Sequence, residues 1–323
     1  MQGKDALWYV ADGQIELRPS PPCPLHEGYV LVRARFSAIS RGTERLVFRG
    51  RIPTTEHDRM RCPHQEGTFP FPVKYGYALA GKITDGPAQR IGQSVFVLHP
   101  HQREICIPEQ DAYLIPNGVP LRRATLAANM ETALNIVWDA GVAPGDHVLI
   151  VGGGTVGMLT AAIAARTAGT VVTVVDIDAA KATAAAKLGA RFASVTSAPV
   201  DQDVVIHTSG AEDGLGLALQ CAGTEANVVE ASWYGDQQIK LGLGTAFHSR
   251  RLRLLSSQVG AVPADRRARW PTARCLKTAL ELLREDVFDT LISGEIAFSE
   301  AAAKVPVLLS AANQGFTTVL SYP

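Results

Sequence analysis

The chain has 323 residues, of which 46% are hydrophobic. This fraction is typical of a globular protein and excludes disorder as the main state. The 31 Lys and Arg residues balance the 31 Asp and Glu residues, so bulk charge provides no attraction for nucleic acid or an anionic membrane, and we expect neither as a partner. No apolar run approaches the roughly 18 residues that a membrane span needs. The first residues lack the basic-then-apolar order of a signal peptide, so we expect a cytoplasmic protein.

The first 125 residues are rich in proline and contain short runs in which apolar and polar residues alternate. Examples are Tyr29–Ala34 and Ser94–Leu98. Such runs between Pro and Gly turns predict strands, and therefore a mostly β region.

From about residue 125, continuous apolar runs alternate with Ala-rich helical stretches. Apolar runs without alternation indicate strands that are covered on both faces, as in a parallel sheet built from βαβ units. The predicted strands are His147–Val151, Val171–Val175, Val204–His207, Asn227–Ala231 and Leu252–Ser256. A helix over Arg274–Arg284 and a last strand over Gly315–Leu320 are expected to follow.

A glycine-rich turn joins the first of these parallel strands to a helical stretch. Gly152, Gly154 and Gly157 form a G-x-G-x-x-G pattern, which indicates a dinucleotide site when it lies between a buried strand and a helix. Gly152 is expected to form the tight turn. Gly154 is expected to let backbone N–H groups approach a pyrophosphate, and Gly157 to let the helix pack closely on the strand. Thr155 and Val156 lie within the same turn and are counted among the cofactor contacts.

A carboxylate follows the next predicted strand. Asp176 lies 19 residues after Gly157, where it can accept hydrogen bonds from a ribose 2′-hydroxyl and repel a 2′-phosphate. No Arg or Lys follows within the next four residues. The sequence therefore predicts NAD(H) as cofactor, with Ile177 beside it in the same site.

Seven segments, in order and spacing, resemble the medium-chain dehydrogenase/reductase family, the zinc alcohol dehydrogenase superfamily. They are Pro24–Arg35, Ala38–Glu44, Tyr75–Gly81, Ile91–Val95, Glu131–Leu134, Ala143–Asp146 and Lys187–Ala190. The turn I-S-R-G-T-E is similar to a subgroup that includes bacteriochlorophyllide-type dehydrogenases. The resemblance implies an α/β protein, in which residues 1–126 and 259–323 form a GroES-like β domain and residues 127–258 an inserted Rossmann domain.

The chain departs from the zinc members of this family at the expected metal ligands. Ser40 and Arg41 occupy the turn that holds a cysteine ligand, and Tyr77 replaces a histidine, whereas Glu131 matches the third ligand position. Catalytic zinc needs three protein ligands, so we expect no metal. A rearranged site of His99, His101 and Glu131 is the alternative.

Without zinc, another group must polarise the substrate oxygen. The candidates are Tyr77, Thr43, Glu131 and His99, and Tyr77 could donate a proton; alternatively it is an ordinary aromatic residue. By resemblance, Thr43 and Glu44 match positions that relay a proton, although Glu44 could instead accept hydrogen bonds from backbone N–H groups. Ser40 completes the candidate catalytic set.

The resemblance also places Ser257 near the nicotinamide amide and implies a homodimer formed through the edge of the Rossmann sheet. The function predicted first is an NAD(H)-dependent oxidoreductase that acts on a small alcohol or carbonyl substrate without zinc. The alternatives are a zinc-independent enoyl or quinone reductase, and a dinucleotide-binding protein that has lost catalysis.

Overall fold

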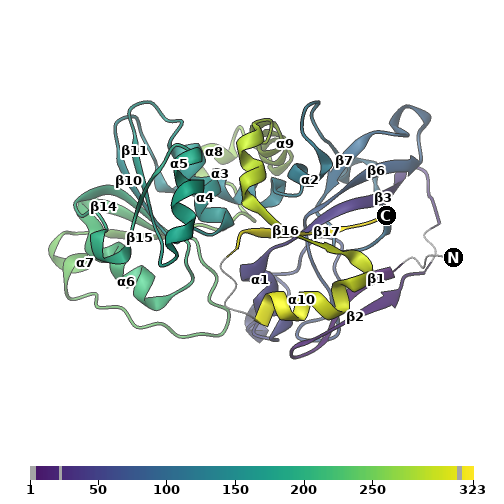
Figure 1. Ribbon diagram of the computed structural model, residues 1–323, viewed down its shortest axis with the longest axis horizontal. Coiled ribbons are helices and arrows are strands. Elements are labelled where there is room, and N and C mark those ends of the chain that lie inside the picture. The colour runs from purple at the N-terminus through teal and green to yellow at the C-terminus, as the bar shows by residue number, and fades with distance from the viewer. Residues whose placement is uncertain (1–4, 22–23, 311–314) are drawn as a thin grey trace. The chain divides into compact units, whose positions relative to one another are not determined.

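The computed structural model describes residues 5–21, 24–310 and 315–323. By its contacts the chain divides into two compact units (Figure 1). Unit 1 consists of Met1–Ala128, Leu280–Glu285 and Ile292–Pro323, and unit 2 of Asn129–Ala279 and Asp286–Leu291.

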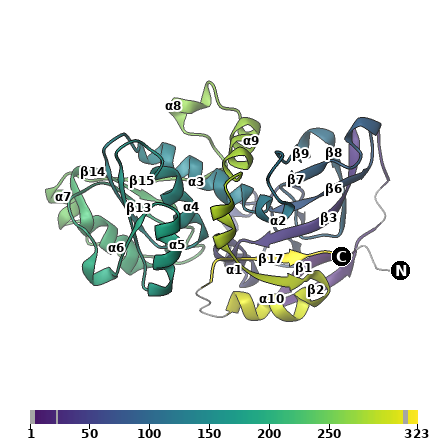
Figure 2. The same cartoon turned by 45° about the horizontal axis from the view of Figure 1, so that its top comes forward.

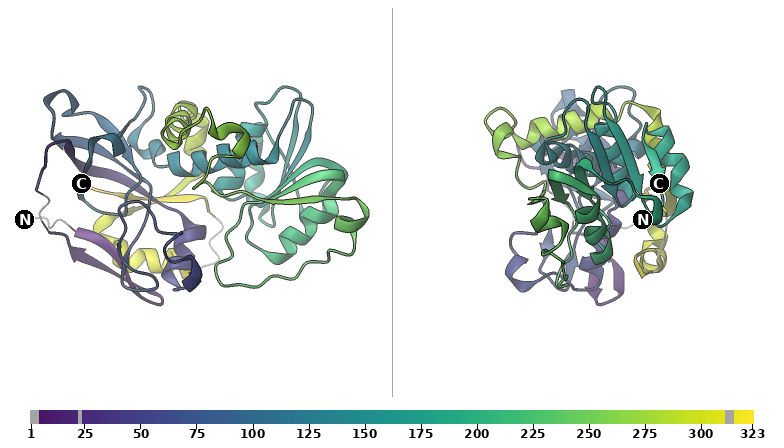
Figure 3. Two further views of the ribbon diagram at one scale, coloured as in Figure 1. Left: turned by 180° about the vertical axis from the view of Figure 1, so that it is seen from behind. Right: turned by 90° about the vertical axis from the view of Figure 1, so that its left-hand side faces the viewer.

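Unit 1 is built mainly from antiparallel strands, which confirms the expected β character of the first third. A seven-stranded sheet has the order β16-β17-β3-β6-β7-β9, and β8 pairs with β3. Its strands are β3 (Tyr29–Ile39), β6 (Leu79–Asp85), β7 (Ser94–Val97), β8 (Glu104–Pro108), β9 (Tyr113–Leu114), β16 (Ile292–Ala297) and β17 (Thr317–Ser321). A four-stranded sheet has the order β2-β1-β5-β4. Its strands are β1 (Asp5–Ala11), β2 (Gln14–Pro19), β4 (Glu66–Gly67) and β5 (Val73–Lys74). Strands β1 and β17, from opposite ends of the chain, belong to this one unit (Figure 3).

The helices of unit 1 are short. They are α1 (Arg41–Phe48), α2 (Leu121–Ala124) and α10 (Ala301–Ser310). Helix α10 lies along β2 (Figure 2). Helix α1 starts directly after β3 and has Ser40 as its N-cap residue. The candidate catalytic residues Ser40, Thr43 and Glu44 are therefore held by the end of a sheet strand and the first turn of a helix.

Unit 2 contains a six-stranded parallel sheet of order β12-β11-β10-β13-β14-β15. Its strands are β10 (His147–Val151), β11 (Val171–Val175), β12 (Arg191–Ala193), β13 (Gln202–His207), β14 (Ala222–Glu230) and β15 (Arg253–Ser256). The predicted parallel sheet is confirmed, and two strand predictions coincide with β10 and β11. Strand β12 was missed because three residues are too short to form an apolar run.

The helices of this part of the chain precede, connect or follow the parallel strands. They are α3 (Ala127–Ala140), α4 (Thr155–Ala164), α5 (Ala182–Lys187), α6 (Glu212–Cys221), α7 (Ala246–Ser249), α8 (Ala264–Arg267) and α9 (Thr272–Leu282). Helices α4 and α5 lie side by side (Figures 1 and 2). Strands β10 and β13 are neighbours, although β11 and β12 lie between them in sequence. This is the point where the strand order reverses and where Rossmann sheets bind ligands.

The division into units differs from the sequence-derived one after residue 258. Residues 259–279 group with the Rossmann sheet rather than with the β unit. The packing of aromatic residues accounts for this, because the Trp270 ring lies 4.7 Å from the Trp138 ring on α3. The Arg266 and Arg274 guanidinium groups lie over these two rings, at 5.4 and 3.9 Å from the ring centres.

Apolar residues form the interior, as the hydrophobic composition predicts. Val148, Leu149 and Ile150 of β10 are fully buried, as expected for a strand covered on both faces. Cys221 and Cys275 are buried too, whereas Cys23 lies outside the described residues. Among the residues described, no helix is long and apolar enough to cross a membrane.

Candidate active site

The glycine turn between β10 and α4 has the geometry of a dinucleotide site. Gly152 has a φ of +110°, and a Cβ atom there would lie 2.6 Å from the Ser209 amide nitrogen. A Cβ atom on Gly157 would lie 2.0 Å from the Gly152 carbonyl oxygen. Beside Gly154, by contrast, no described atom other than those of its chain neighbours lies within 4 Å of such a Cβ atom. Gly152 thus forms a tight turn, Gly157 allows close packing of the helix, and Gly154 leaves an open approach. These three residues fit a dinucleotide.

Asp176 follows β11 and is held beside this turn. Its Oδ2 accepts a hydrogen bond of 2.7 Å from the Gly153 amide, and its Oδ1 one of 2.9 Å from the Asp178 amide. Lys181 Nζ lies 3.1 Å from Oδ2. The four residues after Asp176 contain no Arg or Lys, but the fifth residue is Lys181. The 3₁₀ turn Ala179–Lys181 brings it back to the carboxylate, so the charge beside the expected ribose position is partly neutralised.

The other predicted cofactor residues differ in their surroundings. Thr155 and Val156 belong to the first turn of α4. Ile177 is 88% exposed, which suits a residue at the rim of a ligand site. Ser257 is engaged with α3, because its hydroxyl donates a 2.6 Å hydrogen bond to Asp139 Oδ2.

In unit 1, three predicted catalytic residues meet at the start of α1. The half-buried Tyr77 hydroxyl donates a 2.5 Å hydrogen bond to Ser40 Oγ, and Thr43 is hydrogen-bonded to the same Tyr77 hydroxyl. Burial raises the pKa of Tyr77 to about 12, although the two hydrogen bonds act in the opposite direction. At neutral pH this hydroxyl is protonated and can act as a proton donor.

Glu44 is fully buried beneath these hydroxyls. Its Oε1 accepts a 2.6 Å hydrogen bond from the Ser40 backbone N–H. Its Oε2 accepts a 2.6 Å hydrogen bond from the Tyr9 hydroxyl and lies 3.0 Å from His101 Nε2. The carboxylate therefore accepts a hydrogen bond from a backbone N–H group, which is the alternative to a proton relay that the sequence left open for Glu44. Because it is inaccessible, we treat Glu44 as a positioning residue.

His101 continues this buried network. Its Nδ1 lies 2.7 Å from Ser37 Oγ, which is 2.8 Å from the Tyr322 hydroxyl. Gly76 has a φ of +126°, and a Cβ atom there would lie 2.8 Å from His101 Nε2, so only glycine permits this approach. Sequence reasoning missed the network, apart from Glu44, because its members come from strands far apart in the chain.

His99, two residues before His101, has a different environment. Its ring stacks on His64 at 5.3 Å, and its Nδ1 lies 2.8 Å from the Pro100 carbonyl oxygen. Burial lowers the pKa of His99 to about 3, so the ring is neutral and cannot donate a proton as imidazolium. Of the candidates in unit 1, Tyr77 is therefore the better proton donor.

The residues at the expected zinc positions do not fit zinc. Ser40 and Tyr77 are hydroxyl donors that bond to each other, and both ring nitrogens of His101 are engaged within the buried network. Across the described ranges, no group of three or more His, Cys, Asp or Glu side chains could hold a metal ion.

Glu131, the match to the third ligand position, belongs to α3 in unit 2. Burial raises the pKa of its carboxyl group to about 7. The group thus changes charge near neutral pH and can accept or release a proton there.

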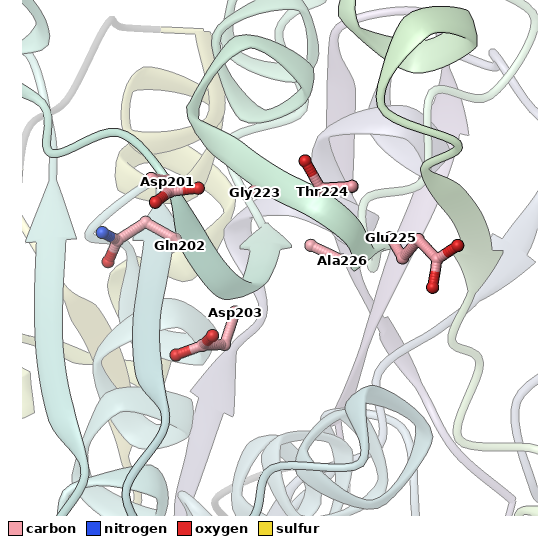
Figure 4. A pocket seen from close by; sticks show the side chains of 7 residues that line it. All are labelled: Asp201, Gln202, Asp203, Gly223, Thr224, Glu225 and Ala226. Carbon is pink, nitrogen blue, oxygen red and sulfur yellow. The ribbon is translucent and has the colours of Figure 1, made fainter.

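A cavity of about 330 Å³ lies elsewhere in unit 2 (Figure 4). Its lining includes Asp201 and Asp203 at the start of β13, together with Glu225 on β14. The glycine turn follows the carboxyl end of β10, whereas this cavity lies where the parallel strand β13 begins. The cavity is therefore separate from the expected cofactor position.

Comparisons with known proteins agree with this geometry. Residues 127–238 match the family described as alanine dehydrogenase/PNT, C-terminal domain. D-guloside 3-dehydrogenase of Escherichia coli K12 is 26% identical over 302 residues, which cover 82% of this chain and 85% of the relative.

Two solved structures share the fold over nearly the whole chain. A structure described as a short chain alcohol dehydrogenase from E. coli CFT073, solved with NADH, has a TM-score of 0.77 at 15% identity and covers 98% of this chain and 99% of its own. A putative zinc-binding dehydrogenase from Sinorhizobium meliloti 1021, bound to NADP, has a TM-score of 0.76 at 19% identity and covers 99% and 100%. The chain therefore has the fold of these dehydrogenases over nearly its whole length, and its sequence is similar to that of D-guloside 3-dehydrogenase.

Proposed function

We propose that this protein is an NAD(H)-dependent dehydrogenase that interconverts an alcohol and a carbonyl group on a polyol or sugar derivative without zinc. The observation that carries the proposal is the Gly152–Gly157 turn with Asp176 hydrogen-bonded beside it. The similarity to D-guloside 3-dehydrogenase supports the substrate class, because it extends through both units.

The preference for NAD(H) over NADP(H) is supported by Asp176. This carboxylate can accept hydrogen bonds from ribose hydroxyls, and its charge disfavours a 2′-phosphate. Lys181 reduces this discrimination because its ammonium group lies 3.1 Å from the carboxylate. We therefore expect a preference for NAD(H) that is moderate rather than absolute.

A bound nicotinamide supplies the hydride chemistry, and the chain must handle one proton. Tyr77 is the proposed proton donor for a developing alkoxide, because its hydroxyl is protonated at neutral pH. Ser40 and Thr43 hold this hydroxyl, and Glu44 holds the Ser40 backbone.

The test is a panel of gulosides, polyols, ketones, enones and quinones, followed by NADH absorbance. We expect turnover on a polyol or sugar derivative, and a loss of about 10²–10⁴-fold in kcat for Tyr77→Phe if the hydroxyl donates the proton. Tyr75→Phe is the matched control, because it removes a neighbouring buried hydroxyl whose ring packs edge-on against Tyr77. Equal effects of the two variants would contradict a specific role for Tyr77.

A second candidate is zinc-independent reduction of a carbon–carbon double bond conjugated to a carbonyl. The neutral Tyr77–Ser40 hydroxyl pair favours it, since an enolate needs only a hydrogen-bond or proton donor. Turnover on enones alone would select this reaction. NADH binding without turnover on any member of the panel would instead indicate a protein that has lost catalysis.

We also propose a homodimer formed through β15. This strand is the last of the six in the parallel sheet, and its Leu254 and Leu255 side chains are each 37% exposed. Exposed apolar residues on an edge strand are a surface that a second chain can cover.

A further inference from the structure

Three side chains form a hydrogen-bonded line at the carboxyl end of β13. Ser209 Oγ lies 2.6 Å from His207 Nε2, and His207 Nδ1 lies 2.7 Å from Glu230 Oε2. Glu230 ends the neighbouring strand β14, where it is paired in register with His207. A carboxylate only accepts hydrogen bonds, so Nδ1 carries the proton. In a neutral imidazole Nε2 is then free to accept the proton of Ser209.

The carboxylate of this line is firmly held. Its Oε1 accepts a 2.6 Å hydrogen bond from the Ser232 amide, and its Oε2 accepts one of 2.9 Å from the Tyr234 hydroxyl. Burial by itself raises the pKa of Glu230, but the contacts with His207 and Ser232 hold it below its ordinary value. Glu230 is therefore ionised at neutral pH and can orient the ring and stabilise an imidazolium.

Nucleophilic catalysis needs an exposed nucleophile and a base and a carboxylate that are shielded from solvent, and the three side chains meet this need. The His207 side chain is fully buried and that of Glu230 is 15% exposed, whereas Ser209 is exposed. Gly214, in the first turn of α6, leaves room for the pair, because a Cβ atom there would lie 2.4 Å from Ser209 Oγ and 2.7 Å from His207 Nε2.

We propose that Ser209, His207 and Glu230 form a second active site that hydrolyses small neutral esters. Ser209 Oγ attacks the ester carbonyl carbon as its proton passes to His207 Nε2. The bond to the alcohol oxygen breaks, and His207 returns the proton to that oxygen. Water then attacks the acyl-serine with His207 as base, which releases the acid and restores the serine.

Helix α6 supplies the polar environment for the carbonyl oxygen. The N–H groups of its first turn have no partner within the helix and can stabilise a developing oxyanion. The Ala211 amide, just before α6, already donates a 3.3 Å hydrogen bond to Ser209 Oγ. Glu212 and Asp213 place two negative charges in the same turn, which disfavours anionic esters. The expected substrates are therefore uncharged.

The experiment uses a fluorophosphonate probe on the purified chain, with peptide mass spectrometry to locate the adduct. Attack by Ser209 Oγ forms a P–O bond, breaks the P–F bond and releases fluoride, and His207 takes the proton. We expect a single adduct on the peptide that contains Ser209. We also expect hydrolysis of p-nitrophenyl acetate to fall at least about tenfold in Ser209→Ala.

Two glycine variants of one helix form the matched comparison. Gly214→Ala should abolish labelling, because the new methyl group displaces Ser209 from His207. Gly216→Ala should label like the wild type, since a Cβ atom there meets no described atom within 4 Å apart from its chain neighbours and the nearby backbone of its own helix. An unlabelled wild-type Ser209, or equal labelling of the two glycine variants, would overturn the proposal. Neither measurement involves NAD(H), so the result tests ester hydrolysis separately from the proposed dehydrogenase activity, although Ser209 lies next to Gly152 of the glycine turn.

Discussion

The pairing of Asp176 with Lys181 makes a quantitative prediction about cofactor choice. Asp176→Asn removes the negative charge but keeps a side-chain oxygen that can accept a hydrogen bond from the Gly153 amide. The variant also leaves the Lys181 ammonium group without the carboxylate that now neutralises it. The two cofactors should therefore respond in opposite directions, with NADH binding more weakly and NADPH more tightly.

The magnitude follows from the hydrogen bonds at this carboxylate. A hydrogen bond to a charged group contributes roughly 1.5–3 kcal/mol, so its weakening should raise the Kd of NADH by about 10- to 100-fold. The Asp176 and Lys181 side chains are only 10% and 13% exposed, so solvent screens the lysine incompletely. Its attraction for a 2′-phosphate should lower the Kd of NADPH by about tenfold or more.

The assay is fluorescence titration with NADH and NADPH, which needs no substrate. Lys181→Met should weaken NADPH binding, because it leaves Asp176 to face the 2′-phosphate alone. Lys187→Met is the matched control, since it removes the same charge from an exposed position at the end of α5 and should change neither Kd. Unchanged NADH affinity in Asp176→Asn would refute the assignment of this carboxylate to the ribose.

Three further predictions concern stability and assembly. Glu44→Gln should lower the free energy of unfolding by about 1–3 kcal/mol, more than Tyr9→Phe, because it disturbs the buried contacts with His101 and the Ser40 backbone as well as the hydrogen bond from Tyr9; urea titration measures both. The raised pKa of Glu131 favours the protonated folded state, so stability falls as pH rises from 4.5 through about 7. Glu131→Gln should abolish this fall in urea midpoints measured across that range. Leu254→Asp should give a monomer in sedimentation, and a wild-type monomer would contradict the dimer.

Local sequence patterns were sufficient to predict the parallel sheet and the glycine turn. Strand β10 is an apolar run without alternation, and Gly152 and Gly157 are required by contacts within a few residues of the turn. Lys181 was missed because its approach to Asp176 depends on a single turn of 3₁₀ helix. The sequence gives no signal for that turn beyond the Asp178 side chain that caps it.

Contacts between residues far apart in the chain could not be predicted from a single sequence. Ser37 and Tyr322 form a hydrogen bond across 285 positions, and Tyr9 reaches Glu44 across 35. Nothing in the spacing of these residues indicates that they meet, because the meeting depends on which strands become neighbours. The boundary near residue 279 was missed for the same reason, since it depends on the contact between Trp138 and Trp270.

The buried network has a consequence for the chemistry proposed for Tyr77. The Glu44 carboxyl group adds to the effect of burial in raising the pKa of Tyr77, because its negative charge disfavours a tyrosinate beside it. The hydroxyl thus gives up a proton only to a strong base, such as a developing alkoxide or enolate. At neutral pH it is almost entirely protonated, so little of the tyrosinate that would accept a proton in the reverse reaction is present. This electrostatic arrangement favours carbonyl reduction at neutral pH and makes alcohol oxidation depend on alkaline conditions.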